Sequence, residues 1–177
     1  RAHQLTVFLL LGLALTCTNA DDNVAWQAGL SRVDVTPKEP VRMSGYGSRD
    51  HANEGIDTPL FVRCLALRPD SDGQPSVLIS VDTIGLSGSM TEQLAKTVLE
   101  THGIARQRLV FCSTHTHCGP DLLGQLSNIF AEQLSTQEIA AGKRYKQQLE
   151  QGILSAIDLA LADLSPARLA YGAGEAT

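Results

Sequence analysis

The chain has 177 residues, of which 43% are hydrophobic and 19% are charged, and its formal net charge is −5 at pH 7. This length suits one domain with a hydrophobic core of its own. Because acidic residues are in excess and no basic stripe is present, we expect no nucleic-acid partner.

Residues 1–20 have the pattern of a secretory signal peptide. The stretch from Leu5 to Leu15 is almost wholly apolar, Arg1 precedes it, and small residues ending at Ala20 suit cleavage by a signal peptidase. The stretch is too short to cross a bilayer, which takes about 20 apolar residues. We therefore expect an exported protein, periplasmic or secreted, that begins near Asp21 and has no transmembrane span.

Strand and helix signals alternate along the rest of the chain. Strands are predicted at 26–35, 60–67, 77–81 and 109–113, with a further strand starting at Leu169. The stretch 77–81 is continuously apolar, which is typical of a strand buried on both faces. The glycine-rich stretch from Met43 to Arg49 is a loop, either a plain turn or the rim of a site.

Two capping boxes, Ser89-x-x-Glu92 and Ser135-x-x-Glu138, predict the starts of two helices. The first helix ends at Gly103. The second is long, with an interruption near Gly142, and is stopped by Pro166. The alternation predicts an α/β domain with a mixed, partly parallel sheet covered by helices.

Three cysteines follow the leader, Cys64, Cys112 and Cys118. An odd number leaves at least one thiol unpaired. Cys64 and Cys112 lie within apolar strand-like stretches, so we expect both in the core. An oxidising compartment would also permit a disulfide.

The residues with the clearest chemistry are Thr114-His115-Thr116-His117-Cys118-Gly119-Pro120, directly after the predicted strand 109–113. Side chains two residues apart share one side of an extended backbone, so His115 and His117 project together if the strand continues. Two imidazoles at a strand end can hold Zn²⁺. In the alternative interpretation, one histidine is exposed and the other is hydrogen-bonded in a loop.

Asp82 ends the strand 77–81, as the His-Thr-His motif follows the strand 109–113. Ligands of open α/β sheets bind outside the carboxyl ends of strands. If the two strands are parallel neighbours, Asp82 lies near the histidines and can accept the spare ring N–H of a metal-binding histidine. Asp82 could equally cap the turn that follows it.

Four segments in this order resemble the N-terminal domain of the neutral/alkaline non-lysosomal ceramidases, and within them bacterial relatives. The segments are Ala28–Pro37, Gly45-Tyr46, Ser80-Val81-Asp82 and Ser113–Pro120. The resemblance runs from about Ala28 to the end of the chain. It implies a zinc-dependent amidohydrolase that splits ceramide into a sphingoid base and a fatty acid, and therefore a lipid or amide substrate met at a membrane surface.

The resemblance also implies roles for the motif. His115 would be a zinc ligand and His117 a catalytic residue, with Asp82 and Cys118 as supporting groups around the metal. Cys118 stands where the family usually has serine, which adds a soft ligand or an oxidisable thiol. The family's other ligands, a His, a Glu and a Tyr, would follow Thr177. We therefore expect residues 21–177 to be an incomplete N-terminal part of the catalytic domain, inactive alone.

Three other functions remain open. A hydrolase of the metallo-β-lactamase type also has a His-x-His at a strand end, but Gly119-Pro120 stands where its Asp-His is expected. A cysteine hydrolase could pair Cys118 with either histidine. A non-catalytic exported binding domain would use the loop from Gly45 to Arg49 as its surface.

Overall fold

The computed structural model describes residues 26–70, 73–124 and 134–175. The predicted signal peptide lies outside these residues. The elements, in chain order, are β1 (Trp26–Asp34), β2 (Phe61–Pro69), β3 (Ser76–Val81), α1 (Gly88–His102), the 3₁₀ turn η1 (Arg106–Arg108), β4 (Leu109–Ser113), α2 (Thr136–Ala162) and β5 (Ser165–Ala167).

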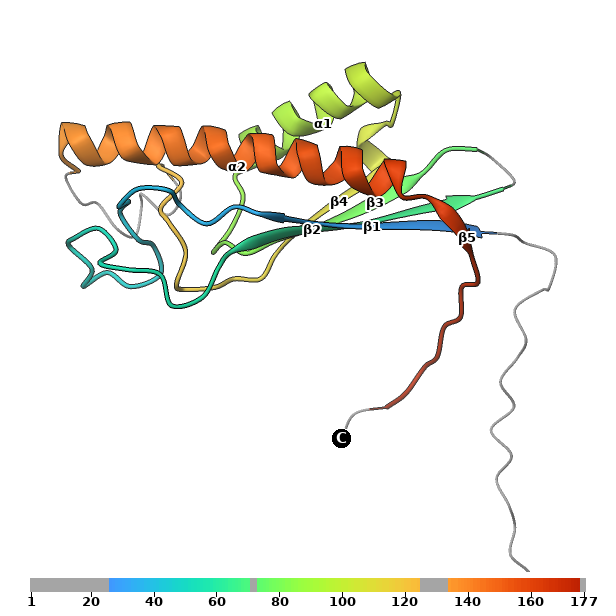
Figure 1. Cartoon of the computed structure of the whole chain (residues 1–177), viewed down its shortest axis with the longest axis horizontal. Helices are drawn as coiled ribbons and strands as arrows, with labels where there is room; N and C mark the ends of the chain where they lie inside the picture. The colour runs from blue at the N-terminus through green and yellow to red at the C-terminus, as the bar shows by residue number, and fades with distance from the viewer. Residues whose placement is uncertain (1–25, 71–72, 125–133, 176–177) are drawn as a thin grey trace, which may run out of the picture.

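The described strands form one sheet in the order β4-β3-β2-β1-β5. β3 and β4 are parallel, with α1 as their crossover, and the other neighbouring strands are antiparallel. Both helices lie on the same face of this sheet (Figure 1). The predicted α/β fold with a mixed, partly parallel sheet is therefore confirmed, with one parallel pair among the described strands.

The core lies between this face and the helices. Alternate residues of each strand point into it, and α1 and α2 add apolar stripes at helical spacing. The close packing of α2 on β1 depends on glycine: a Cβ on Gly29 would lie 2.0 Å from the carbonyl oxygen of Ala160. Fully buried members include Val62, Ala66, Val77, Ile79 and Val81 from the strands, and Val98, Leu149, Ile153 and Ile157 from the helices.

The helices correct two predictions and confirm two others, one of which is the end of the first helix at Gly103. α1 is capped by Ser87, whose Oγ accepts a hydrogen bond from the Met90 N–H, so the box predicted at Ser89 is wrong. The box at Ser135 and Glu138 is confirmed in both directions. α2 runs through Gly142 without interruption, because that glycine is buried against Leu123 within the helix face.

The end of the chain also differs from the prediction. α2 ends at Ala162, before Pro166, and Pro166 itself lies in the short strand β5. The strand expected from Leu169 is not formed, since residues 168–175 have no regular structure. β5 already supplies the antiparallel partner for the start of β1.

Burial on the strands is one-sided, which overturns two further expectations. Leu78 in the middle of β3 is 42% exposed, and Cys112 on β4 is exposed. Both point to the face opposite the helices, where no other described element packs. Cys64 is buried as predicted. In the described part of the chain, neither helix has the length and hydrophobicity needed to cross a bilayer.

Candidate active site

The parallel pair of strands brings the predicted site residues to one edge of the sheet. Val81 of β3 pairs with Ser113 of β4, and the Thr114 N–H donates to the Val81 carbonyl just beyond the last pair. Asp82 and the His-Thr-His loop, which we define as residues 114–120, follow these two strand ends. The sequence prediction that they share one edge is confirmed.

His115 adopts a left-handed backbone conformation, with φ at 58°. This conformation is uncommon for residues other than glycine and concentrates at functional sites. The extended backbone expected through the motif therefore ends at Ser113, because the chain turns at His115. The two imidazoles nevertheless come together, with ring centroids 5.2 Å apart and planes at 69°.

The His115 ring is oriented by a backbone carbonyl. Its Nδ1 lies 2.8 Å from the carbonyl oxygen of Ile84, in the turn after β3. A carbonyl only accepts, so Nδ1 carries a proton, and in the neutral ring the lone pair is then on Nε2. This arrangement is typical of a histidine prepared to bind a metal through Nε2.

His117 is enclosed by the rim loop, which we define as residues 43–49. The Tyr46 ring meets the His117 ring edge-on at 5.1 Å. Gly45 has φ at 104° and lies so close that a Cβ would be 2.7 Å from the His117 Cα. The Arg49 guanidinium donates to the His117 carbonyl oxygen at 2.5 Å. The interpretation of this loop as the rim of a site agrees with these contacts.

Asp82 and Cys118 line a common cleft with Thr116, but neither has a histidine side chain as its hydrogen-bond partner. The Asp82 carboxylate accepts hydrogen bonds from the Phe61 N–H at 2.9 Å and from Arg63 at 3.0 Å. The carbonyl of Ile84, rather than Asp82, holds the spare nitrogen of His115. Cys118 has an exposed free thiol, and its backbone N–H donates to the Thr116 hydroxyl.

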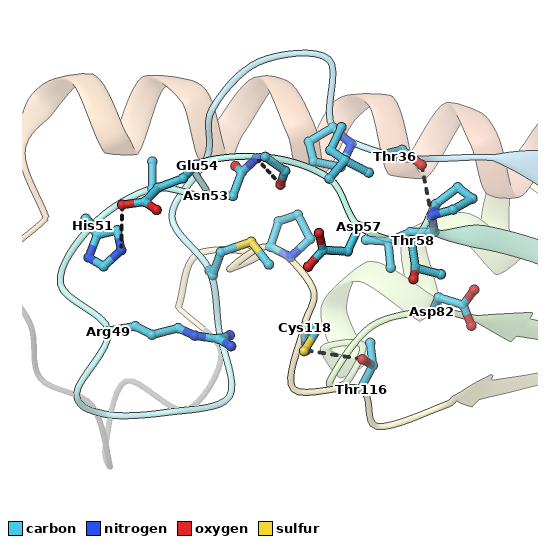
Figure 2. Close-up of a pocket in the computed structure, with 18 residues that line it drawn as sticks. Thr36, Arg49, His51, Asn53, Glu54, Asp57, Thr58, Asp82, Thr116 and Cys118 are labelled. Carbon is cyan, nitrogen blue, oxygen red and sulfur yellow. Dashed lines mark hydrogen bonds and ion pairs between the residues drawn. The ribbon is translucent and has the colours of Figure 1, made fainter.

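A cleft of about 940 Å³ opens beside the His-Thr-His loop (Figure 2). Asp82, Thr116 and Cys118 form one wall, and residues 49 and 51–60 form much of the rest. Asp57 points into the cleft from this second segment (Figure 2). The lining combines carboxylates with apolar side chains, among them Met43, Ile56, Pro59, Leu60 and Pro120. The cleft therefore suits a ligand with both polar and apolar parts.

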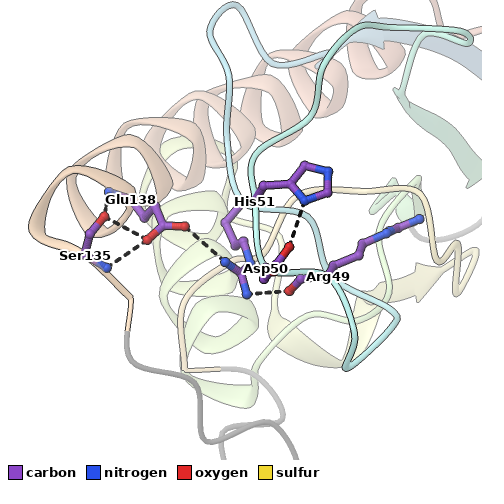
Figure 3. Close-up of polar contacts among 6 residues, drawn as sticks. Arg49, Asp50, His51, Ser135 and Glu138 are labelled. Carbon is purple, nitrogen blue, oxygen red and sulfur yellow. Dashed lines mark hydrogen bonds and ion pairs between the residues drawn. The ribbon is translucent and has the colours of Figure 1, made fainter.

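A chain of polar contacts joins the rim loop to the start of α2 (Figure 3). Glu138 closes the capping box with Ser135 and also pairs with Arg42 at 3.1 Å. The hydrogen bonds from Ser135, and then the Arg42 guanidinium, hold the pKa of Glu138 below its usual value. Arg42 is 7% exposed and donates through its other nitrogen to the Arg49 carbonyl.

Sequence reasoning missed this polar chain and the segment 51–60. Arg42 and Glu138 are 96 residues apart, and no motif or spacing joins them. The one available signal was the polar stretch Asn53–Thr58 directly before β2, a position where loops carry binding residues. His51, for which the sequence offers no metal-binding spacing, lines the cleft and contacts Asp50.

The side chains of the His-Thr-His loop include atoms that can bind a metal ion. His115 presents a free Nε2, and His117 and Cys118 add nitrogen and sulfur donors, which suit zinc. Within residues 26–70, 73–124 and 134–175, no group of three or more His, Cys, Asp or Glu is arranged to hold a metal ion. The donor atoms present are of kinds that zinc binds, but the described residues alone do not assemble a set of three.

Comparisons with known proteins identify relatives of this chain. Two curated relatives, both called neutral ceramidase, are 28% identical to the chain: one from Pseudomonas aeruginosa over 92% of it, and one from Mycobacterium tuberculosis over 75%. The chain spans only 24% and 21% of their lengths. The crystal structure of the Pseudomonas enzyme matches the fold with a TM-score of 0.68 at 21% identity, over 82% of this chain and 23% of that one.

A structure described as ceramidase complexed with C2 gives a TM-score of 0.67 at 19% identity, covering 81% of this chain and 22% of that one. Residues 26–177 match the family model of the neutral/alkaline non-lysosomal ceramidase N-terminal domain. This match covers most of the chain, and the chain therefore belongs to the neutral/alkaline non-lysosomal ceramidase family.

Proposed function

We propose that the full-length protein is a zinc-dependent hydrolase of N-acyl amides, and that ceramides are its substrate class. The observation that carries this proposal is the orientation of His115. Its Nδ1 is held by the Ile84 carbonyl, which leaves Nε2 as the nitrogen for another partner, and its ring lies beside that of His117 at the carboxyl end of parallel strands. Membership of the ceramidase family supports the choice of substrate.

In this proposal the two histidines have different roles. His115 would bind zinc through Nε2, and the ion would polarise the amide carbonyl and lower the pKa of water. His117 would transfer a proton to the departing amine, since its ring lies beside that of His115. The cleft beside the His-Thr-His loop is lined by Thr116 and Cys118 but by neither His115 nor His117. It would hold the rest of the substrate, with apolar side chains against the lipid part and polar side chains near its head.

The remaining parts of the site would come from the rest of the full-length protein. A catalytic zinc takes about three protein ligands and an open position, which is more than the described residues assemble. We therefore propose that residues 21–177 alone bind zinc weakly and have no amidase activity. We further propose that the protein is exported after cleavage near Asp21, which N-terminal sequencing of the mature protein tests.

The test compares His115→Ala, His117→Ala and His102→Ala in the full-length protein. Zinc content is measured by mass spectrometry, and hydrolysis with a fluorescent ceramide analogue. We expect His115→Ala to lose zinc and activity together, and His117→Ala to lose activity while keeping most of the metal. His102 pairs with Asp158 away from the cleft, so its replacement should change neither.

Two outcomes would contradict the proposal. Equal zinc content and turnover in the wild type and His115→Ala would exclude His115 as a ligand. Activity that survives a chelator but is abolished by Cys118→Ala would point to a cysteine hydrolase instead. If the protein binds zinc but cleaves an amide other than ceramide, the proposed mechanism stands and the proposed substrate class is wrong.

A further inference from the structure

We propose that Arg49 is a positioning residue that holds His117 in its working orientation. This inference rests on the proposed function, in which His117 transfers a proton. Two features of the rim loop lead to it: Arg49 binds the backbone of His117, and it stacks on the aromatic ring that contacts the His117 side chain.

The first feature is a clamp between two loops. One guanidinium nitrogen of Arg49 donates to the carbonyl of Ser44 at 2.7 Å and to the carbonyl of His117 at 2.5 Å. The Ser44 N–H in turn donates to the Gly119 carbonyl at 2.9 Å. Hydrogen bonds from a charged donor are stronger than neutral ones, so Arg49 fixes the His-Thr-His loop against the rim loop.

The second feature is a stack of side chains. The Arg49 guanidinium lies 4.9 Å from the centre of the Tyr46 ring, and Tyr46 meets His117 edge-on at 5.1 Å. Tyr46 is 55% exposed, so little else restrains its ring. Arg49 therefore holds both the backbone of His117 and the aromatic ring beside its imidazole.

The charged group of Arg49 contacts backbone carbonyls of the two loops. Within the described residues it forms no salt bridge, and its guanidinium faces carbonyl oxygens instead. Its own carbonyl accepts from Arg42, which is buried and paired with Glu138 in the first turn of α2. The rim loop is thus anchored to the start of α2 through Arg42 (Figure 3). Arg49 in turn holds the backbone of His117 through its hydrogen bond to the His117 carbonyl.

The test uses Arg49→Ala and Arg49→Lys in the full-length protein, with Arg106→Ala as the matched control. Arg106 also donates to a backbone carbonyl, that of Leu109, and stacks on an aromatic ring, that of Phe111. It lies at the opposite end of β4 from the His-Thr-His loop. Both kinetic constants are measured, together with the rate at which diethyl pyrocarbonate modifies His117, read by peptide mass spectrometry.

We expect Arg49→Ala to lower kcat by roughly 10- to 100-fold, the size of effect that follows from a small misplacement of a catalytic group. KM and zinc content should change little, and His117 should be modified several-fold faster. Arg49→Lys should recover part of kcat, because lysine keeps the charge but not the flat group that stacks on Tyr46. Arg106→Ala should match the wild type in every measurement.

A raised KM with unchanged kcat and unchanged modification would mean that Arg49 binds substrate directly, and would overturn the proposal. No change in any measurement would overturn it as well. If the wild type does not cleave ceramide, the proposed function fails, and the modification rate alone then decides whether Arg49 positions His117. If Arg49→Ala does not fold, Arg49→Lys decides by the same measurements.

Discussion

Tyr145 on α2 buries its hydroxyl without a hydrogen-bond partner among the described residues. The residue is 4% exposed. Burial, and then the negative charge of Asp82, raise the pKa of Tyr145, so the hydroxyl stays protonated. A buried polar group without a partner destabilises a fold, because it loses its hydrogen bonds to water.

We therefore expect Tyr145→Phe to keep or increase stability, with a gain of about 0–1 kcal/mol in the free energy of unfolding. Chemical denaturation measures the change, and Tyr46→Phe serves as the exposed control. A loss of more than about 1 kcal/mol would show that the hydroxyl has a partner outside the described residues.

The cysteines divide by burial. Burial raises the pKa of the Cys64 thiol to about 12, despite a hydrogen bond with Ser31 that acts in the other direction. Cys112 and Cys118 are exposed. At pH 8 we expect iodoacetamide to label Cys112 and Cys118 in the folded protein and to leave Cys64 unmodified until denaturant is added, as mass spectrometry of the peptides would show.

The raised pKa of Cys64 also predicts a pH dependence. Well below pH 9 the Cys64 thiol is neutral in the folded and in the unfolded protein, so it does not make the free energy of unfolding depend on pH. From about pH 9.0, its ordinary pKa, to about pH 12 the unfolded chain loses the proton while the folded protein keeps it. The free energy of unfolding should therefore fall over this range. Cys64→Ala should lose this part of the slope, and an unchanged slope would contradict the assignment.

At the scale of elements, the sequence predicted whatever depends on local pattern. Short apolar stretches located β1 to β4, and the Ser135 box located the start of α2. Ser89-x-x-Glu92 matches the same pattern, but Ser89 is not the cap. The cap is Ser87, two residues before it, whose side chain accepts a hydrogen bond from the N–H of the buried Met90. Ser87 and Ser89 were both possible caps for α1, and only the packing of the folded helix decides between them.

In the candidate site, too, the sequence predicted the features that depend on local pattern and missed those that depend on packing. His115, His117 and Asp82 were proposed from their positions at strand ends, and the parallel pairing of β3 and β4 brings these two strand ends together. The left-handed turn at His115 and the contacts of Arg49 were not, because they depend on loops that meet across 68 residues. Long-range loop contacts leave no periodic signal in a sequence.

The assignment of Ser87 and Ser135 as helix caps can be tested by comparing them with Ser89. Ser87→Ala and Ser135→Ala should each lower the free energy of unfolding by about 1 kcal/mol, since each removes the side chain that satisfies a helix N–H. Ser89→Ala should have a much smaller effect, because its hydroxyl contacts only the Ser87 hydroxyl among the described residues. Thermal unfolding of the three variants measures the difference, and equal losses at Ser87 and Ser89 would contradict the cap.

At the scale of the whole molecule, the sheet has one covered and one open face (Figure 1). The register aligns Leu30, Leu65, Leu78 and Val110 in one row across β1, β2, β3 and β4 on the open face. Leu30 is 66% exposed, and Val110 is 53% exposed. A continuous row of apolar side chains is a surface that another layer of protein normally covers.

The row predicts how residues 21–177 behave when expressed alone. We expect self-association, because water-exposed apolar surface and an edge strand such as β4 both favour pairing with other chains. Leu30→Lys combined with Val110→Lys should shift the protein toward monomer and reduce its binding of a hydrophobic dye, because two charges would interrupt the row. Leu99→Lys is the control, since Leu99 is 50% exposed but lies on α1. Size-exclusion chromatography with light scattering measures the oligomeric state. Monomeric wild type, or an equal effect of the Leu99 control, would show that the open face is not what drives association.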